Sequence, residues 1–344
     1  MTNDELKVGI TAVFDPEVTP HARTFLRALA TARNHIPALA RVNFVFADDA
    51  ADPECARTVA ENFVAQGVDL VIGHFSSDAA LAAIDTYEKA DIAMLTPAAT
   101  ANAVTASPAA FRLCPNDALL AANLLALCIQ KEWRNLHVRS DDSAHGKAIA
   151  EAIRVAAAEY GVVLTDTTNK AHAVVFAGRI APSGAYMRQH LQSDPGLPLI
   201  LTDDAVSPQL AGQSGLAAPI LAIGFRSAQS YPDAALVCEH YRLLFGSPPE
   251  TYFLESYAAL EILASLVDAR PRPRMTKALG AGQFETALGP VQFENGQATG
   301  LSHAVWSLGA NGFTVEDQDI AAQLEKPQAV AAPTPAFADQ RMSS

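Results

Sequence analysis

The pattern of apolar and polar residues is most regular between residues 68 and 105. Residues 70–73 form a short apolar run ending in glycine, which is typical of a buried parallel strand. Residues 79–90 then have a helical pattern, and residues 92–95 form a second apolar strand. A strand, a helix and a second parallel strand make a βαβ unit. The loops after the two strands should therefore emerge at the same edge of the sheet, where open α/β sheets bind ligands.

The rest of the chain repeats this alternation of strands and helices in two successive blocks. The first block has further strands at 6–13 and 42–47 and helices at 19–33 and 53–66, and residues 111–117 lead into another helix at 118–131. The pattern then restarts, with strands at 135–139, 162–165, 173–177, 197–201 and 220–223 and helices at 147–160 and 186–192. Helices at 231–245 and 254–269 and strands at 289–293 and 302–308 follow, each of these strands before an Asn-Gly turn. Two such blocks predict two doubly wound, Rossmann-like α/β lobes.

The two loops of the central unit carry groups that suit a small anion. The start of a helix presents unpaired N–H groups, and Ser76, Ser77 and Thr100 add hydroxyls that both donate and accept hydrogen bonds. Ala98 and its alanine neighbour are small enough for a ligand to approach the backbone. A purely structural alternative, in which Ser77 only caps the helix and residues 97–99 are only a loop, stays open at this point.

Composition and charge narrow the class of protein. The 344 residues are 50% apolar and 18% charged, which is typical of a globular protein. A formal net charge of −13 argues against nucleic acid as a partner. The first ten residues have neither the basic nor the apolar region of a secretory leader. We therefore expect a cytoplasmic protein as the sequence is written, or a periplasmic one if a leader has been removed.

Motifs for cofactors, metals and catalysis are absent from the sequence. It has no GxxxxGK[ST], GxGxxG or HExxH pattern, so neither a cofactor nor a metal is expected. No nucleophile–base pair is placed at the predicted edge, so we expect no enzymatic activity. Of two histidines that we singled out, His74 is expected to pack within its loop, whereas His145 is a candidate for ligand contact.

Several separate segments resemble one protein family in the same order. The segments VIGHFSS, DTYEKADIAMLTPAATANAVT, FRLCPND, SDDSAHGKAIAEAI, GPVQFENGQATG and SHAVWSLGANGF are similar to the Leu/Ile/Val-binding proteins. These are amino-acid receptors of the type I periplasmic binding protein fold that serve ABC importers. The resemblance covers roughly residues 6–315, and its strength lies in the ordered set of motifs.

The resemblance implies a clamp whose two lobes close by hinge motion on a small ligand. We expect lobe 1 to comprise residues 6–118 and 251–299, and lobe 2 to comprise residues 119–250 and 300–317. Three crossing segments should join them, near residues 116–119, near Thr251 and near residues 298–301. Residues 318–344 are rich in Ala and Pro, and we expect them to be disordered. The implied partners are a small-molecule ligand and the membrane subunits of an ABC transporter; the oligomeric state stays open.

The resemblance also implies roles for individual residues. The family's serine and threonine that hold the ligand α-carboxylate match Ser77 and Thr100, and Ala98 is placed to offer backbone groups. The family's acidic residue that holds the ammonium group matches Asp204, with Asp203 as the alternative because the register is loose.

Two departures from the family leave the ligand open. His145 stands where the family often has an aromatic residue, and Arg179 follows Gly178 where aromatics often lie. An arginine in the cleft would favour a ligand with an extra acidic or amide group, but it could also point to solvent. The alternative function is a cytoplasmic sensor similar to the amide-binding regulators of amidase expression.

Overall fold

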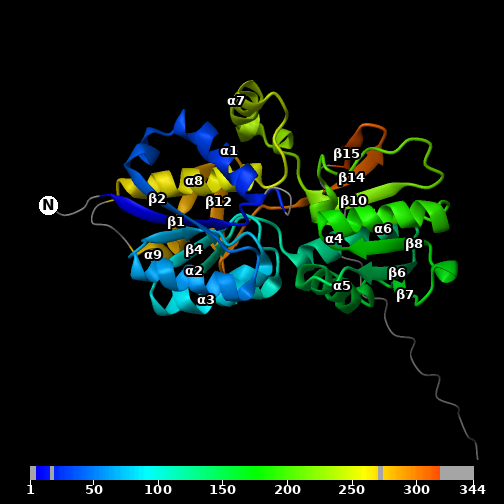
Figure 1. Cartoon of the computed structure of the whole chain (residues 1–344). Helices are drawn as coiled ribbons and strands as arrows, with labels where there is room; N and C mark the ends of the chain where they lie inside the picture. The colour runs from blue at the N-terminus through cyan, green and yellow to red at the C-terminus, as the bar shows by residue number, and fades with distance from the viewer. Residues whose placement is uncertain (1–4, 16–18, 270–273, 318–344) are drawn as a thin grey trace, which may run out of the picture.

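The computed structural model describes residues 5–15, 19–269 and 274–317, and their strands form two separate sheets (Figure 1). The first sheet contains β1 (Leu6–Ala12), β2 (Val42–Asp48), β3 (Leu70–Ile72), β4 (Ala93–Thr96), β5 (Ala110–Arg112), β11 (Gln283–Thr286), β12 (Gly289–Glu294) and β13 (Gln297–Ala298). The second contains β6 (Asn135–Ser140), β7 (Val163–Leu164), β8 (Ala173–Ala177), β9 (Leu199–Leu201), β10 (Ile220–Phe225), β14 (His303–Gly309) and β15 (Gly312–Asp317). Each sheet is the centre of one lobe, which confirms the predicted pair of α/β lobes.

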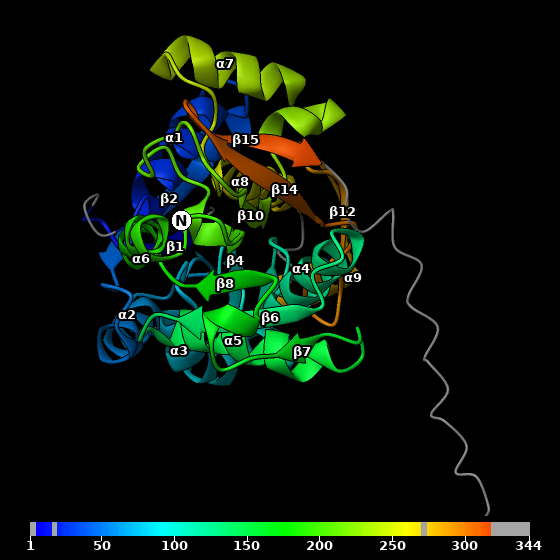
Figure 2. The same cartoon turned by 90° about the vertical axis from the view of Figure 1, so that its right-hand side faces the viewer.

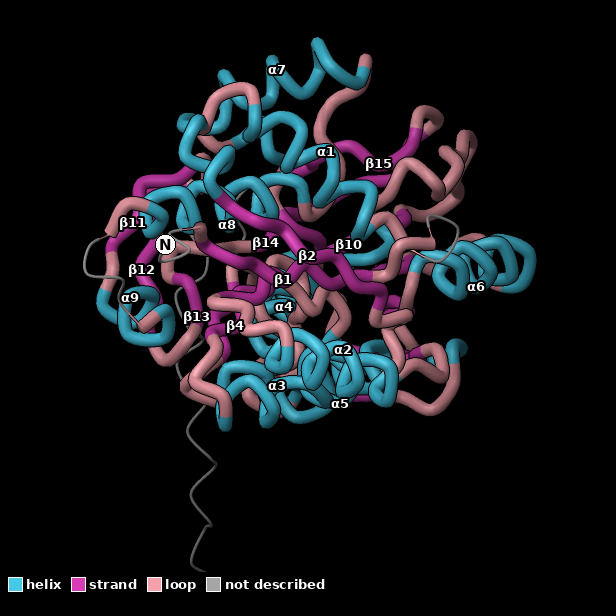
Figure 3. Tube along the Cα trace, turned by 60° about the vertical axis from the view of Figure 1, so that its left-hand side comes forward, coloured by secondary structure: helices cyan, strands magenta, loops and turns pink. Residues whose placement is uncertain are grey.

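The helices lie on both faces of each sheet (Figure 3). The first lobe has α1 (His21–Arg33), α2 (Pro53–Ala65), α3 (Ser77–Lys89), α8 (Phe253–Val267) and α9 (Met275–Ala281). The second lobe has α4 (Asp117–Gln130), α5 (Ala144–Ala157) and α6 (Ile180–Ser193). Six short 3₁₀ helices, Pro37–Arg41, Asn102–Ala106, Thr168–Lys170, Asp203–Ala205, Ala228–Ser230 and Pro232–Ala234, connect these elements in the described residues. None of the described helices combines the length and apolar character needed to cross a bilayer.

Alternation along the strands explains why both faces of each sheet are covered. In β3, Leu70 and Ile72 pack into the core with α1 and α8, whereas Val71 packs with α2 and α3. Strand β8 lies beside β6 in the second sheet (Figure 2). In β8, Val175 faces the core of α4 and α5, and Val174 faces the opposite core. Strands buried on both faces need a near-continuous apolar sequence, which is the pattern that identified them.

The strand orders show how the chain passes between the lobes. The first sheet has the order β11-β12-β13-β5-β4-β3-β1-β2 and the second β15-β14-β10-β9-β8-β6-β7. The chain therefore changes sheets after β5, after β10 and after β13. Both Asn-Gly turns join antiparallel strands, β12 with β13 and β14 with β15, as predicted.

Helix α7 (Ala235–Phe245) differs from the sequence-based division, which placed residues 119–250 in the second lobe. Its buried residues Val237, Cys238 and Tyr241 belong to the core formed by α1 and α8 in the first lobe. By packing, the chain thus leaves the second lobe directly after β10, before the predicted crossing near Thr251. The apolar face of a helix does not reveal which of two adjacent cores it covers. The predicted disordered segment 318–344 lies outside the described residues.

The central βαβ unit has the predicted arrangement. Strands β3 and β4 are parallel, with Leu70 opposite Ala93. Between them, α3 begins at Ser77, which places the first turn of the helix at the carboxyl edge of the sheet.

Helix α6 begins at Ile180, six residues before the predicted helix at 186–192. The sequence Pro-Ser-Gly at residues 182–184 reads as a helix breaker. Here its proline lies in the first turn, where a missing N–H removes no helical hydrogen bond. The early start makes Arg179 the N-cap residue and brings it to the edge of the second sheet.

Candidate functional site

A cleft between the lobes collects most of the predicted site residues. Its lining includes Ser77 and Ala98 from the first lobe and His145, Arg179 and Asp204 from the second. Counting the part that is open to solvent, the space between the walls is about 510 Å³. The sixth predicted residue, Thr100, does not line this cleft. Whether any of these residues contacts a ligand stays a prediction.

The first-lobe wall is built on the start of α3. Ser76 is the N-cap residue, and Ser77 accepts a hydrogen bond from the backbone N–H of Ala101 through its Oγ at 3.1 Å. This bond ties the two loops of the βαβ unit together and leaves the hydroxyl proton of Ser77 to be donated elsewhere. The first N–H groups of a helix have no partner within it, so the wall is suited to an anion.

Thr100 is buried, and the carbonyl groups of its loop are bound by a buried arginine. Arg112, itself only 1% exposed, donates from Nη1 to the carbonyl oxygens of Thr100 at 3.0 Å and Ala101 at 2.6 Å. The side chain of Thr100 is also 1% exposed, and its Oγ1 makes no hydrogen bond within the described part of the chain. The predicted contact with a ligand carboxylate would therefore need a small rearrangement of this loop.

A buried network supports the loop that follows β3. His74 is fully buried, with Nδ1 2.6 Å from Oδ2 of Asp49 and Nε2 3.0 Å from the hydroxyl of Tyr87. Thr11 donates to the same carboxylate at 3.0 Å. Burial acts to raise the pKa of Asp49, but the hydrogen bond and charge of His74 outweigh it and hold that pKa below its usual range. His74 therefore has the structural role that the sequence predicted.

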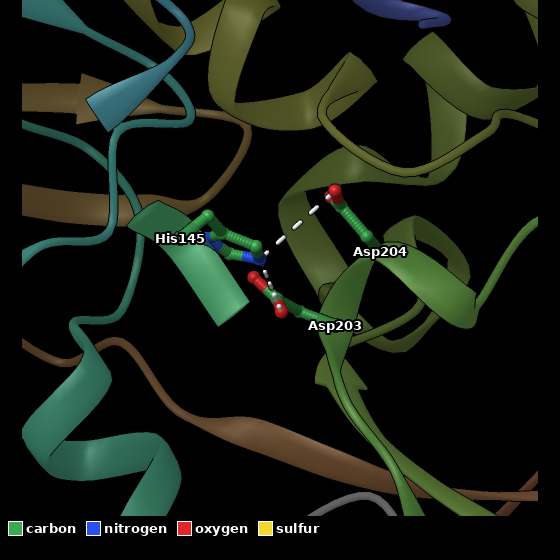
Figure 4. Close-up of side chains that lie close together, drawn as sticks. All are labelled: His145, Asp203 and Asp204. Carbon is green, nitrogen blue, oxygen red and sulfur yellow. Dashed lines mark ion pairs between the residues drawn. The ribbon is translucent and has the colours of Figure 1, made fainter. Parts of the chain in front are cut away.

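The second-lobe wall brings His145 against two carboxylates (Figure 4). Nε2 of His145, in the first turn of α5, lies 3.5 Å from Oδ1 of Asp203 and 4.0 Å from Oδ2 of Asp204. Asp204 faces the cleft, whereas Asp203 is 1% exposed. Burial acts to lower the pKa of His145, but Asp203, Asp204 and Asp117 outweigh it and raise that pKa to about 10. His145 is thus an imidazolium at neutral pH.

These three side chains are also the one group among the described residues that could hold a metal ion, since one nitrogen and two oxygens lie within 4.8 Å of one another. A metal would have to displace the proton that the surrounding carboxylates hold on His145.

An aromatic wall contributes residues that the sequence analysis did not find. The ring of His21 lies 5.4 Å from that of Phe75 and 5.1 Å from that of Tyr252. Burial lowers the pKa of His21 to about 4, so its ring is neutral. Tyr252 donates its hydroxyl to Oδ1 of Asp204 and thereby links the two lobes. His21 follows the loop after β1 at the same sheet edge as the central unit, a signal that could have identified it.

Arg179 also spans the cleft. Its Nη2 lies 3.6 Å from Oδ2 of Asp78 in the first turn of α3, and its side chain is 36% exposed. Both interpretations of Arg179 are partly realised, since the residue lines the cleft and is accessible to solvent. Because Asp78 already balances its charge, the site does not need an acidic ligand group to explain Arg179.

Replacing Arg179 with glutamine is expected to weaken ligand binding less than about fivefold, because partly exposed ion pairs contribute about 0–1 kcal/mol. Isothermal titration calorimetry would measure the change, with the exposed Arg188 of the same helix replaced by glutamine as the control. A loss greater than about fiftyfold would instead mean that Arg179 binds the ligand directly.

Comparisons with known proteins agree with this architecture. Residues 39–185 match the model of a family described as periplasmic binding protein. Over 305 residues the chain is 26% identical to Leu/Ile/Val-binding protein homolog 2 of Brucella abortus, covering 79% of this chain and 81% of that protein.

Solved structures share the fold. The leucine-binding protein LivK of Thermotoga maritima superposes with a TM-score of 0.80 at 18% identity, covering 90% of this chain and 97% of that one. A solute-binding protein of an ABC transporter from R. palustris, in complex with benzoate, gives a TM-score of 0.77 at 15% identity, with 91% and 96% covered. At these identities the likeness shows the two-lobed fold alone.

Proposed function

We propose that the chain is a non-catalytic solute-binding receptor for a small amino-acid-like ligand, as its similarity to a Leu/Ile/Val-binding protein homolog supports. One observation carries the proposal: the two sides of a single interlobe cleft offer complementary hydrogen-bonding groups, N–H donors on one side and a carboxylate acceptor on the other. The first-lobe side has the start of α3 with Ser77, and the second-lobe side has the carboxylate of Asp204. A zwitterionic amino acid matches both sides at once.

The proposed mechanism couples binding to closure. The ligand carboxylate would accept hydrogen bonds from the start of α3, with Ser77, Ala98 and Thr100 as the nearest groups, while its ammonium group would donate to Asp204. A ligand that touches both lobes binds the closed state more tightly than the open one, so it shifts the population towards closure. The Tyr252–Asp204 hydrogen bond already joins the lobes in the same place and would be shared with the ligand.

Replacing Asp204 with asparagine is expected to weaken amino-acid binding by about ten- to a hundredfold, because truncating one partner of a buried charge pair costs about 2 kcal/mol or more. A thermal-shift screen of amino acids, amides and small carboxylates on both proteins would measure this. Asp233, an exposed aspartate outside the cleft, replaced by asparagine, is the control. If no amino acid raises the melting temperature at millimolar concentration, the proposal fails.

We propose the membrane subunits of an ABC importer as the partner that recognises the closed form. That role would place the receptor in the periplasm. The amide-binding sensor uses the same fold, and the same screen separates the two: ligands that are amides and bind independently of Asp204 would favour the sensor.

A further inference from the structure

Carboxylates outnumber cations around the cleft. The acidic side chains of Asp78 and Asp204 lie at its walls, and those of Asp117 and Asp203 lie buried behind them. Three cations act on this group: His145 at 3.5 Å from Asp203, Arg179 at 3.6 Å from Asp78, and the buried Arg112, whose charge acts on Asp117; the ring of His21 is neutral. With all four carboxylates ionised, the region has one more negative than positive charge.

The buried members of this group lack hydrogen-bond partners. Asp203 is 1% exposed and neither of its carboxylate oxygens is hydrogen-bonded within the described residues. Asp117, at the start of α4, is 2% exposed, and its Oδ1 has no hydrogen-bond partner that meets strict geometric criteria within the described residues. Buried polar groups without partners are costly, at about 1–3 kcal/mol each, so such a concentration indicates a group that the ligand supplies.

His145, Asp203 and Asp204 lie together, with one nitrogen and two oxygens within 4.8 Å of one another. The charges of Asp203 and His145 also act on Asp117. Burial raises the pKa of Asp117, with the charge of Asp203 adding to it and that of His145 opposing it. An additional cation would relieve this repulsion. His145 faces Oδ1 of Asp203, so Oδ2 is the oxygen left for a further donor.

We propose that the ligand is an α-amino acid whose side chain carries a second ammonium group, seated against Asp203, with the charge of Asp117 acting on it from behind. This inference rests on the proposed function, with Asp204 taking the α-ammonium group. A neutral zwitterion would leave the charge excess unchanged, whereas a diamino acid brings a net positive charge and three further N–H donors for the unpartnered oxygens. Because carboxylate oxygens of Asp204 and Asp203 lie within 4.8 Å of each other, the two ammonium groups must be close together, which favours a side chain of two or three methylene groups.

Matched pairs of ligands test the proposal. L-ornithine and L-norleucine have side chains of the same length that differ in a terminal ammonium or methyl group, as do L-2,4-diaminobutyrate and L-norvaline. Titration calorimetry with the full chain should show the diamino acid of at least one pair binding more than tenfold tighter than its neutral partner. Asp203→Asn should abolish this preference, and Asp117→Asn should reduce it. Glu159→Gln, an exposed carboxylate removed at the far end of α5, should leave it unchanged.

The outcomes separate this inference from the function on which it rests. If the neutral amino acids bind as tightly as the diamino acids, the charge argument is wrong and the receptor function stands. If neither series binds, both fail. If Zn²⁺ alone raises the melting temperature and Asp203→Asn removes that effect, the cluster is a metal site and the ammonium assignment is overturned. If Asp203→Asn does not fold, Asp117→Asn replaces it as the test: an unchanged preference for the diamino acid in that variant would contradict the proposal.

Discussion

Replacing Asp49 with alanine is expected to lower the free energy of unfolding by about 3–5 kcal/mol, the usual cost of removing one partner from a buried charged pair. The carboxylate holds His74, the hydroxyl of Thr11 and the backbone N–H of Ala51. His74 and Thr11, both fully buried, would lose a partner in a place that water does not reach. Urea unfolding followed by circular dichroism at pH 7 would measure the change.

The neighbouring residue provides a matched control. Asp48 is exposed and accepts hydrogen bonds from the backbone N–H groups of Ala50 at 2.8 Å and Phe14 at 3.3 Å. Asp48→Ala should cost about 1 kcal/mol or less, because water can replace the lost partner. Equal costs for the two substitutions would show that the network around His74 contributes nothing beyond an ordinary surface turn. The loop after β3 should also bind ligand less well in Asp49→Ala, since it loses its anchor.

Replacing Glu255 with glutamine is expected to stabilise the protein at pH 8 by up to about 3 kcal/mol, since one pKa unit corresponds to about 1.36 kcal/mol. Burial in the first turn of α8 raises the pKa of Glu255 from 4.5 to about 7. Between pH 4.5 and about 7, the folded state therefore keeps a proton on Glu255 that the unfolded state has released. The resulting penalty is absent below pH 4.5, grows as the pH rises to about 7, and is constant above it.

The test is a difference between two pH profiles. Melting temperatures of wild type and Glu255→Gln should agree at pH 4.5 and diverge through neutral pH, with the variant more stable. Glu239→Gln, on the exposed side of α7, should follow the wild type throughout. A constant offset between Glu255→Gln and wild type at every pH would mean that packing, and not ionisation, separates them.

The parts of the molecule that follow from local pattern could be predicted. Apolar runs identified β3 and β4, and the parallel geometry of a βαβ unit then placed Ser77 and Ala98 at one sheet edge. The family resemblance added Asp204, and the structure puts it across the cleft from them. Chain connectivity and strand direction decide these positions, and both are readable from sequence.

Other parts depend on contacts between distant segments. Tyr252 reaches Asp204 from a backbone with a φ of 70° at the start of α8, which no periodicity indicates. Thr100 is buried in a loop whose carbonyl groups accept hydrogen bonds from Arg112, which is distant in sequence. The charge of Arg112 at the end of the apolar strand β5 can be seen in the sequence, but the carbonyl groups that it binds cannot. The assignment of α7 to a lobe likewise required knowing which core its buried face meets.

The second lobe interrupts the first along the chain, and this order has a consequence for folding. Strand β5 is complete in sequence long before its partner β13, and Arg112 meets Gln297 across a separation of 185 residues. Contacts of such separation form slowly. During synthesis, the edge of β5 that pairs with β13 therefore stays unpaired until the ribosome has made the whole second lobe. An unpaired strand edge recruits other chains, so this edge is where we expect aggregation of the nascent protein to begin.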